Sequence, residues 1–468
     1  MTTLRTYKHK HKYNYIDLLK VGLFYYIGGK MTASFSELEF HQKLRENNQQ
    51  FFLKMVASYE KTIAESMRAQ GFKRINQKER TVTFSFGTMT FSRSRWKKGD
   101  IIRVPLDEKL GLIPRQRFSQ EFLYLVTILA SFMPYRKVVE VFDLLQDIGI
   151  SKNVVHRAVS EAGNLIKQKE EYDSWALSES IERKEKIQTD IIYIEGDGVW
   201  VRKSERSSIE LSHFVVHTGS DSSCRKKLQN KFEVINSKVK KAKDTLLDYI
   251  TTNFELAPGT TIITNSDGGK GYTPSSFREF VKFCSKGEHI HFWDPYHVSE
   301  CIKKNLTPIS CDLADAAVKK IRKRDRTGLK VILDTAESLL ETDAKIESFQ
   351  AFKKRIINDF SYTASPKDRG LGDLTIGVME SQHRKMTYRM KKRGMYWSEE
   401  GAVAMAQIIL LYYSGDLRDI FFGSWRKEYK KIKKLDHFDL VRREKKSEHL
   451  IPGARVARDG LTPMIRKL

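Results

Sequence analysis

Cysteines and long apolar runs are scarce in this sequence. Its four cysteines are scattered among 468 residues without C-x-x-C spacing. This pattern argues against a disulfide scaffold and a structural zinc ribbon, and it favours a reducing compartment. No apolar run reaches the roughly 18 residues that a membrane span needs, and no secretory signal is visible. We therefore expect a cytoplasmic protein that does not span a membrane.

Acidic residues are also few in comparison with basic ones. The chain carries 83 Lys and Arg against 58 Asp and Glu, which gives a formal net charge of +25. Such an excess favours a polyanionic partner, most simply nucleic acid, with a membrane surface as the competing explanation. Hydrophobic residues make up 40% and charged residues 30%, which is an ordinary globular balance.

The first 110 residues combine a basic extension with a small α/β region. We interpret residues 1–34 as a flexible extension or as a wrongly assigned upstream start. Within 35–110, apolar spacing predicts a long helix over 35–70, followed by strands at 81–86, 88–91 and 101–104. The strand pair is basic and aromatic, since it carries Arg93, Arg95, Trp96, Lys97 and Lys98. It could therefore lie along a phosphate backbone, or it could form a solvated edge of the sheet.

Residues 111–173 are predicted to be helical and to bind DNA. Helices are indicated at 122–132, 135–145 and 153–169, with a glycine-containing turn before the third and Ser151 as its cap. This is the layout of a helix-turn-helix, although many helix pairs share it without contacting DNA. The start of the third helix, where base edges are usually read, carries Asn153, His156 and Arg157.

Strands and helices alternate between residues 185 and 415. Strands are predicted at 191–201, 211–218, 232–235, 260–265 and 289–293. Three early strands followed by alternation indicate a mixed α/β fold, with one sheet covered by helices on both faces. A helical insertion is expected at about 298–365, and a basic tail at 416–468 closes the chain. The tail's run 426–434 is predicted to contact phosphates.

Two aspartates follow apolar strand patterns. Asp197 ends the run that begins at Ile191, and Asp267 ends the run that begins at Thr261. On a strand, Glu195 shares a face with Asp197, either as its supporting partner or as a solvated side chain. Gly196 and Gly198 would let a metal and a DNA backbone approach Asp197. The alternative for both aspartates is ordinary turn chemistry.

A third carboxylate begins a basic helical stretch. Glu380 shares a helix face with Arg384 and Lys391, so it could bind a metal while the cations flank a phosphate. The positive surface is widened by Lys385, Lys392 and Arg393. The alternative is an ion pair four residues apart on a solvated helix, worth about 0.3–0.5 kcal/mol.

Oxygen ligands of this kind suit Mg²⁺ or Mn²⁺ better than zinc. Two such ions about 4 Å apart can activate an attacking oxygen and stabilise a leaving one at phosphorus. A zinc or iron site is the competing possibility, because His289, His291 and His297 lie close together in the sequence.

A family resemblance rests on four segments: Gly196-Asp197-Gly198-Val199-Trp200, Asp267-Gly268-Gly269, Asp294-Pro295-Tyr296-His297 and Glu380-Ser381-Gln382-His383-Arg384. Together they resemble the acidic-triad (DDE) transposases of bacterial insertion sequences. More narrowly, they resemble the ISLre type, a relative of the Mutator-like superfamily that is also grouped as an uncharacterised, transposase-like protein family. The resemblance runs from about residue 35 to 415, and Asp294 with His297 matches the C/D-x-x-H element of that superfamily.

The resemblance implies an RNase H-like catalytic core. Asp197, Asp267 and Glu380 would be its catalytic metal ligands for two Mg²⁺ or Mn²⁺ ions, with Asp294 and His297 as supporting residues. The implied reaction is cleavage at the element's terminal repeats, followed by attack of the released 3′-hydroxyl on target DNA. The implied partners are double-stranded DNA and further copies of the chain, in a cytoplasmic protein at the bacterial nucleoid.

Three other functions stay open from the residues alone. The first is a catalytically silent DNA-binding protein derived from a transposase. The second is a metal-dependent hydrolase that uses the three histidines named above. The third is a basic structural protein, which would leave the strand-end acids unexplained.

Overall fold

The computed structural model describes residues 36–180, 185–221, 227–391 and 393–433. Its described residues form two compact units: 36–81 with Met89–Leu110, and Val82–Thr88 with 111–433. The extension 1–34, Lys392 and the tail after residue 433 lie outside the described residues.

The first unit is a long helix packed on a three-stranded sheet. Helix α2 (Glu37–Ala69) is followed by β1 (Lys73–Phe84), β2 (Gly87–Lys98), β3 (Ile101–Arg103) and the short helix α3 (Pro105–Lys109). Trp96 is 1% exposed in the core of this unit. Arg93 donates to Asp107 at 2.5 Å. Of the five side chains predicted to make the hairpin basic and aromatic, Trp96 is therefore internal, packed against α2, and Arg93 is half-buried beside Asp107 of α3.

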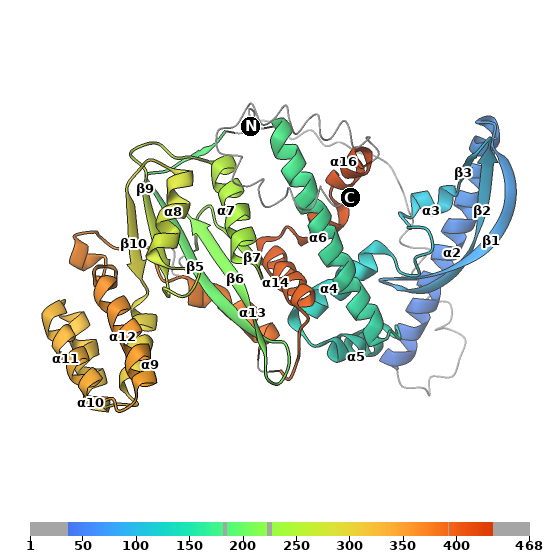
Figure 1. Ribbon diagram of the computed structural model, residues 1–468. Coiled ribbons are helices and arrows are strands. Elements are labelled where there is room, and N and C mark those ends of the chain that lie inside the picture. Colours follow the sequence, from blue (N-terminus) through green and yellow to red (C-terminus); the bar gives the residue numbers. More distant parts are fainter. Residues whose placement is uncertain (1–35, 181–184, 222–226, 392, 434–468) are drawn as a thin grey trace, which may run out of the picture. The chain divides into compact units, whose positions relative to one another are not determined.

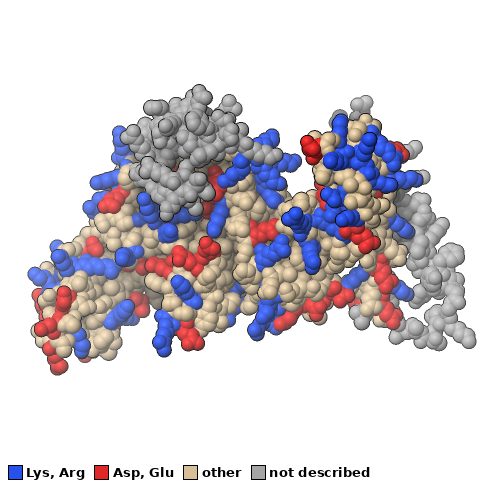
Figure 2. Space-filling model, turned by 45° about the vertical axis from the view of Figure 1, so that its right-hand side comes forward, with Lys and Arg blue, Asp and Glu red and all other residues tan. Residues whose placement is uncertain are grey.

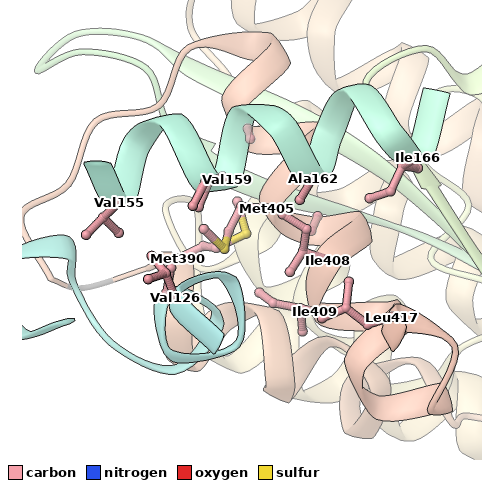
Figure 3. Close-up of a cluster of buried hydrophobic side chains, with 14 of the residues drawn as sticks. Val126, Val155, Val159, Ala162, Ile166, Met390, Met405, Ile408, Ile409 and Leu417 are labelled. Carbon is pink, nitrogen blue, oxygen red and sulfur yellow. The ribbon is translucent and has the colours of Figure 1, made fainter. Parts of the chain in front are cut away.

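Three helices open the second unit, as predicted. They are α4 (Gln120–Phe132), α5 (Tyr135–Gln146) and α6 (Lys152–Ser180), which runs eleven residues beyond the predicted end at 169. The turn after α5 begins at Asp147, whose φ of 53° lies in the left-handed region. Their apolar faces form one core with α14 (Glu399–Ser414) and α15 (Leu417–Phe422), as Figure 3 shows for Val159, Met405 and Ile408.

The centre of the second unit is a mixed five-stranded sheet (Figure 1). Its strand order is β10 (His289–Trp293), β9 (Thr261–Ser266), β5 (Ile191–Arg202), β6 (Ser208–His217) and β7 (Phe232–Asn236). Strands β5, β6 and β7 are antiparallel, whereas β9 and β10 run parallel to β5. A separate parallel pair joins β4 (Ile187–Gln188) to β8 (Phe254–Glu255).

Helices cover both faces of this sheet, which confirms the mixed α/β prediction. One face packs on α7 (Val239–Asn253) and α8 (Pro274–Cys284), and its core includes Ile192, Ile194, Phe214, Val216 and Ile262. We call these five residues the apolar face. The other face is covered by α13 (Met379–Met390), by α14 and by the segment 371–376. Figure 1 shows α13 and α7 on opposite sides of the strands.

A helical insertion follows β10, as predicted. It contains α9 (Pro295–Leu306), α10 (Cys311–Arg322), α11 (Arg326–Ser338) and α12 (Asp343–Asn358), which have an apolar core of their own. Two short 3₁₀ turns, Phe360–Thr363 and Lys367–Arg369, lead from it towards α13. No helix in the described ranges is long and apolar enough to cross a membrane.

Candidate functional site

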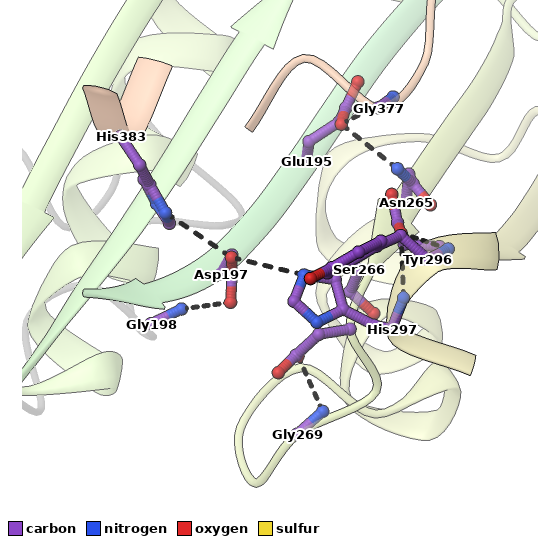
Figure 4. A network of polar contacts seen from close by, with 12 residues as sticks. Glu195, Asp197, Gly198, Asn265, Ser266, Gly269, Tyr296, His297, Gly377 and His383 are labelled. Carbon is purple, nitrogen blue, oxygen red and sulfur yellow. Dashed lines mark hydrogen bonds and ion pairs between the residues drawn. The ribbon is translucent and has the colours of Figure 1, made fainter. Parts of the chain in front are cut away.

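Asp197 lies where three segments of the second unit converge. It stands on β5 opposite His213 of β6, and its side chain is 15% exposed. Its Oδ1 accepts the Gly198 N–H at 2.6 Å. Its Oδ2 lies 3.5 Å from Nδ1 of His383 on α13 and 4.0 Å from Nε2 of His297 on α9 (Figure 4). One carboxylate oxygen is therefore flanked by imidazoles from two different helices.

The face around Asp197 is polar and buried, unlike the face beneath it. Alternate residues of a strand share a face, so Glu195 lies beside Asp197 as predicted. Glu195, His213 and His217 are all fully buried. We call the polar face the set Glu195, Asp197, His213, His217, Glu233 and Asn265.

The two glycines beside Asp197 have a different role from the one predicted. A Cβ on Gly196 would overlap the Phe214 ring, and a Cβ on Gly198 would overlap the Glu210 carboxylate. Both side chains come from β6, because the glycines alternate with Asp197 and face away from it. The glycines are therefore required by cross-strand packing, and they do not by themselves open a path to Asp197.

Asp267 begins the turn directly after β9. Its Oδ1 accepts the Gly269 N–H at 2.7 Å, and its carbonyl accepts the Trp293 indole N–H at 2.6 Å. The φ of Gly268 is +68°, a conformation that favours glycine. Arg355 of α12 donates to the Gly268 carbonyl and stacks on Trp293 at 4.9 Å. The helical insertion thereby holds the turn that carries Asp267.

The Asp-x-x-His element is built around a helix cap. Asp294 follows β10, and its Oδ1 accepts the amides of Tyr296 at 2.9 Å and His297 at 3.2 Å. This is the N-cap arrangement of α9, and the first turn of the helix directs His297 towards Asp197. The backbone amide of Asp294 donates to the Ser266 carbonyl at 2.8 Å, which ties the cap to the end of β9.

Helix α13 brings Glu380 to the edge of this site. Glu380 is exposed in the first turn, and His383 is three residues later on the same side of the helix. The backbone just before α13 passes Asp294, since a Cβ placed on Gly377 would lie 3.8 Å from Asp294 Oδ2. The His383 ring also stacks on His213, with centroids 5.1 Å apart.

Burial and, after it, neighbouring charges shift the pKa values of the titratable groups in the site. Burial, followed by the charge of Asp267, raises the pKa of Asp197 to about 6. Burial is also the main reason that the pKa of His383 is lowered to about 2, so its ring is neutral. Asp197 and Asp267 thus share one electrostatic environment although 70 positions separate them in the sequence.

The donor set suits a hard divalent cation only in part. Asp197 and Asp267 offer carboxylate oxygens with mutual repulsion that a cation would relieve. Among the described residues, however, no three His, Cys, Asp or Glu side chains are gathered closely enough to hold one metal ion. A complete site would therefore require Glu380 to turn in from its exposed position.

The histidine alternative is divided between the two faces of the sheet. His289 and His291 both contact Thr264 Oγ1, at 2.8 and 2.7 Å, and the His291 ring lies 5.5 Å from Phe277 of α8. Burial lowers the pKa of His289 to about 4 and that of His291 to about 3. His297 lies with Asp197 instead, so the three histidines do not form one ligand set.

The residues predicted to bind DNA differ in their accessibility. Asn153, His156, Arg157 and Arg384 are exposed, and Arg393 stacks on Tyr388 at 4.5 Å. Lys385 is turned inward and donates to Glu233 at 2.5 Å, so its charge is already balanced. Lys391 is half-buried, with His383 in its electrostatic environment. In Figure 2 basic side chains are spread over the visible face, with acidic ones between them.

Two residues of the site were left unassigned by the sequence patterns: His213 and His383. Glu195 was predicted beside Asp197 as a supporting partner or a solvated side chain, and its complete burial excludes the second alternative. His213 had no such signal, since strand register decides that it faces Asp197. His383 lies within the Glu380 motif, but only the packing of α13 reveals its contact with Asp197.

Comparison with known proteins relates most of the chain to one family. Residues 30–427 match the model of an uncharacterised protein family, UPF0236. The chain belongs to the UPF0236 family. A UPF0236 protein encoded in the vanSb 3′ region of Streptococcus gallolyticus is 30% identical over 414 residues, which cover 86% of this chain and 88% of that relative. The family match spans every site residue described above, and the family description states no activity.

Proposed function

We propose that this UPF0236 chain is a DDE-type DNA transposase that cleaves and joins DNA strands at the terminal repeats of an insertion sequence. The observation that carries the proposal is the convergence of Asp197, Asp267 and the Asp294–His297 element beside the start of α13. The resemblance assigns catalysis to Asp197 and Asp267 and a supporting role to Asp294 and His297, and together with α13 they come from four separate segments of the chain.

The sheet supports an RNase H-like core within this proposal. Three antiparallel strands followed by two strands parallel to the first, in the order β10-β9-β5-β6-β7, is the arrangement that such a core requires. Asp197 on β5 and Asp267 after β9 then lie on neighbouring strands. In open α/β sheets, ligands usually bind beyond the carboxyl ends of such strands.

Asp197 and Asp267 would hold the divalent ions, with Glu380 as the third carboxylate. A pair of Mg²⁺ or Mn²⁺ ions would activate the attacking oxygen and stabilise the leaving one. Glu380 is exposed, so its carboxylate is accessible to a metal ion and to a DNA substrate. His297 and His383 would flank Asp197 and restrict the positions that its Oδ2 can take.

Double-stranded DNA is the proposed substrate, and at least two copies of the chain would act together. The start of α6 presents Asn153, His156 and Arg157 to solvent after a short turn, as a helix-turn-helix would. The described part of the tail, within α16 (Trp425–Ile432), adds the exposed Lys427, Lys430 and Lys431. These cations fit sequence-independent contacts with phosphates.

The deciding experiment uses the full-length chain and duplex fragments from both flanks of its gene. With Mg²⁺ or Mn²⁺, wild type should nick these fragments and join the ends to a plasmid. Asp197→Asn should reduce cleavage on the order of 10⁴-fold while DNA affinity is retained. Asp190→Asn is the matched control, because Asp190 is an exposed carboxylate directly before the same strand.

Two outcomes would overturn parts of the proposal. If Asp197→Asn cleaves as well as wild type, Asp197 is not a catalytic ligand. If wild type binds the fragments tightly but does not cleave them, whichever divalent metal is added, the chain is the catalytically silent DNA-binding protein derived from a transposase.

A further inference from the structure

Glu195 is a buried carboxylate that connects three segments of the chain. It is 0% exposed, and its Oε2 accepts the Asn265 side-chain amide at 3.2 Å and the backbone amides of Gly377 and Val378 at 3.0 Å each. Figure 4 shows these contacts with Asn265 and Gly377. One oxygen on β5 thus joins β9 to the chain that enters α13.

Such a carboxylate is costly to bury unless donors compensate for the water it loses. Here two of the three donors are consecutive backbone amides at the N-terminus of α13, where Val378 is the N-cap residue. The helix dipole adds to the attraction at this end. Glu195 therefore does for α13 what a capping side chain would otherwise do, although it comes from a distant strand.

The location of this contact connects two of the proposed metal ligands. Asp197 follows Glu195 by two residues on the same face of β5, and Glu380 follows Val378 by two residues in α13. The hydrogen bonds of Glu195 thus set where the first turn of α13 begins relative to Asp197. We propose that Glu195 is a positioning residue that fixes the first turn of α13, and with it the backbone of Glu380, relative to Asp197 so that Glu380 can turn in for metal binding, an inference that rests on the proposed function.

The second oxygen of Glu195 lies opposite a histidine ring, beyond hydrogen-bonding distance. His217 Nδ1 accepts the Gly219 amide at 3.1 Å, so a ring proton is carried by the other nitrogen, Nε2. That nitrogen lies 3.9 Å from Glu195 Oε1, and neither atom has a hydrogen-bond partner within the described residues. Glutamine at position 195 would direct its NH₂ group either towards His217 Nε2 or towards the amides of Gly377 and Val378, which now donate to Oε2. An isosteric amide should therefore lose the arrangement without leaving a cavity.

The test compares Glu195→Gln with Asp107→Asn in the full-length chain. Asp107 is a matched control because it is another buried carboxylate, in the first unit, paired with Arg80 and Arg93. Hydrogen–deuterium exchange should show faster exchange at the amides of Gly377 and Val378 in Glu195→Gln only. Mn²⁺ affinity, measured from the electron paramagnetic resonance signal of the free ion, should fall about 10–100-fold in Glu195→Gln and stay unchanged in the control.

Kinetics add a readout that a purely structural role would not change. The cleavage rate at saturating DNA should fall about 10–100-fold in Glu195→Gln and recover as Mn²⁺ is raised, with the DNA dissociation constant unchanged. If Glu195→Ala folds, it should show the same changes as Glu195→Gln. If Glu195→Ala does not fold, the result of Glu195→Gln alone tests the positioning role.

The outcomes separate this inference from the proposed function. If Glu195→Gln keeps wild-type protection at Gly377 and Val378, or keeps wild-type Mn²⁺ affinity, Glu195 does not position α13 for metal binding. If wild type binds Mn²⁺ more tightly than Glu195→Gln but cleaves no DNA, the positioning role stands and the transposase proposal fails.

Discussion

The two faces of the five-stranded sheet bury their residues equally well but use different chemistry. The apolar face packs Ile194 and Phe214 against α7 and α8, with each of them at most 1% exposed. The polar face buries Glu195 and His213 to the same degree under α13 and the segment before it. Burial alone therefore does not separate the residues that hold the fold from the residues of the candidate site.

The difference lies in how each face offsets the cost of losing water. Burial of apolar side chains stabilises the folded state in proportion to the apolar area removed from water, and it requires no particular partner. Each polar side chain needs donors and acceptors at defined positions, and on this sheet several come from α13: Val378, His383 and Lys385. The polar face therefore positions α13, and the apolar face secures the sheet that carries it.

The largest effect on stability is expected from the apolar face. Ile194→Ala should lower the free energy of unfolding by about 2–5 kcal/mol, because it removes buried methyl groups and leaves a cavity. Asp197→Asn should not lower it, since the change relieves repulsion with Asp267. Urea unfolding followed by circular dichroism measures both. Equal destabilisation by the two variants would remove the distinction between the faces.

An intermediate effect is expected from a buried ion pair on the polar face. Glu233 accepts from His213, Lys231 and Lys385 at 3.2, 2.7 and 2.5 Å. Although burial acts to raise the pKa of Glu233, His213 and the two lysines lower it below the usual 4.5. Glu233→Gln should cost about 1–3 kcal/mol at pH 7.

The pH dependence of that cost has a defined sign. Because the folded-state pKa of Glu233 lies below its unfolded value, the stabilisation is present above pH 4.5 and is lost as the pH falls below it. The gap in unfolding free energy between wild type and Glu233→Gln should narrow below about pH 4. A gap that stays constant from pH 7 to pH 3 would show that the charge of Glu233 contributes nothing.

The smallest effect is expected from a polar residue on the apolar side. Burial, followed by the charge of Asp244, raises the pKa of Asp248 on α7 from 3.8 to about 6. Ionised Asp248 therefore destabilises the fold at pH 7, and Asp248→Asn should gain about 1 kcal/mol there. This gain should disappear as the pH falls through 6 to below 3.8, where the carboxyl is protonated in both states. Urea unfolding at pH 7 and pH 3.5 measures it, and no gain at pH 7 would contradict the assignment.

Local patterns predicted much of the architecture. The helices of 111–173, the five strands, the helical insertion and the shared face of Glu195 and Asp197 all follow from spacing that the chain carries within a few residues. The Asp294 cap is equally local, because its acceptor and the two amides that it binds lie within four residues. Strand ends in the first unit were predicted less well, since β1 begins at Lys73, well before the predicted residue 81.

The sequence by itself determined which residues could be ligands, caps and core, because periodicity and capping act within one or two turns of chain. Only the tertiary structure decided that His383 meets Asp197, that Lys385 faces Glu233 and that Glu195 caps a helix some 180 residues away. These contacts depend on strand register and on the rotation of α13 against the sheet. Both are set by long-range packing, and no short stretch of sequence encodes either of them.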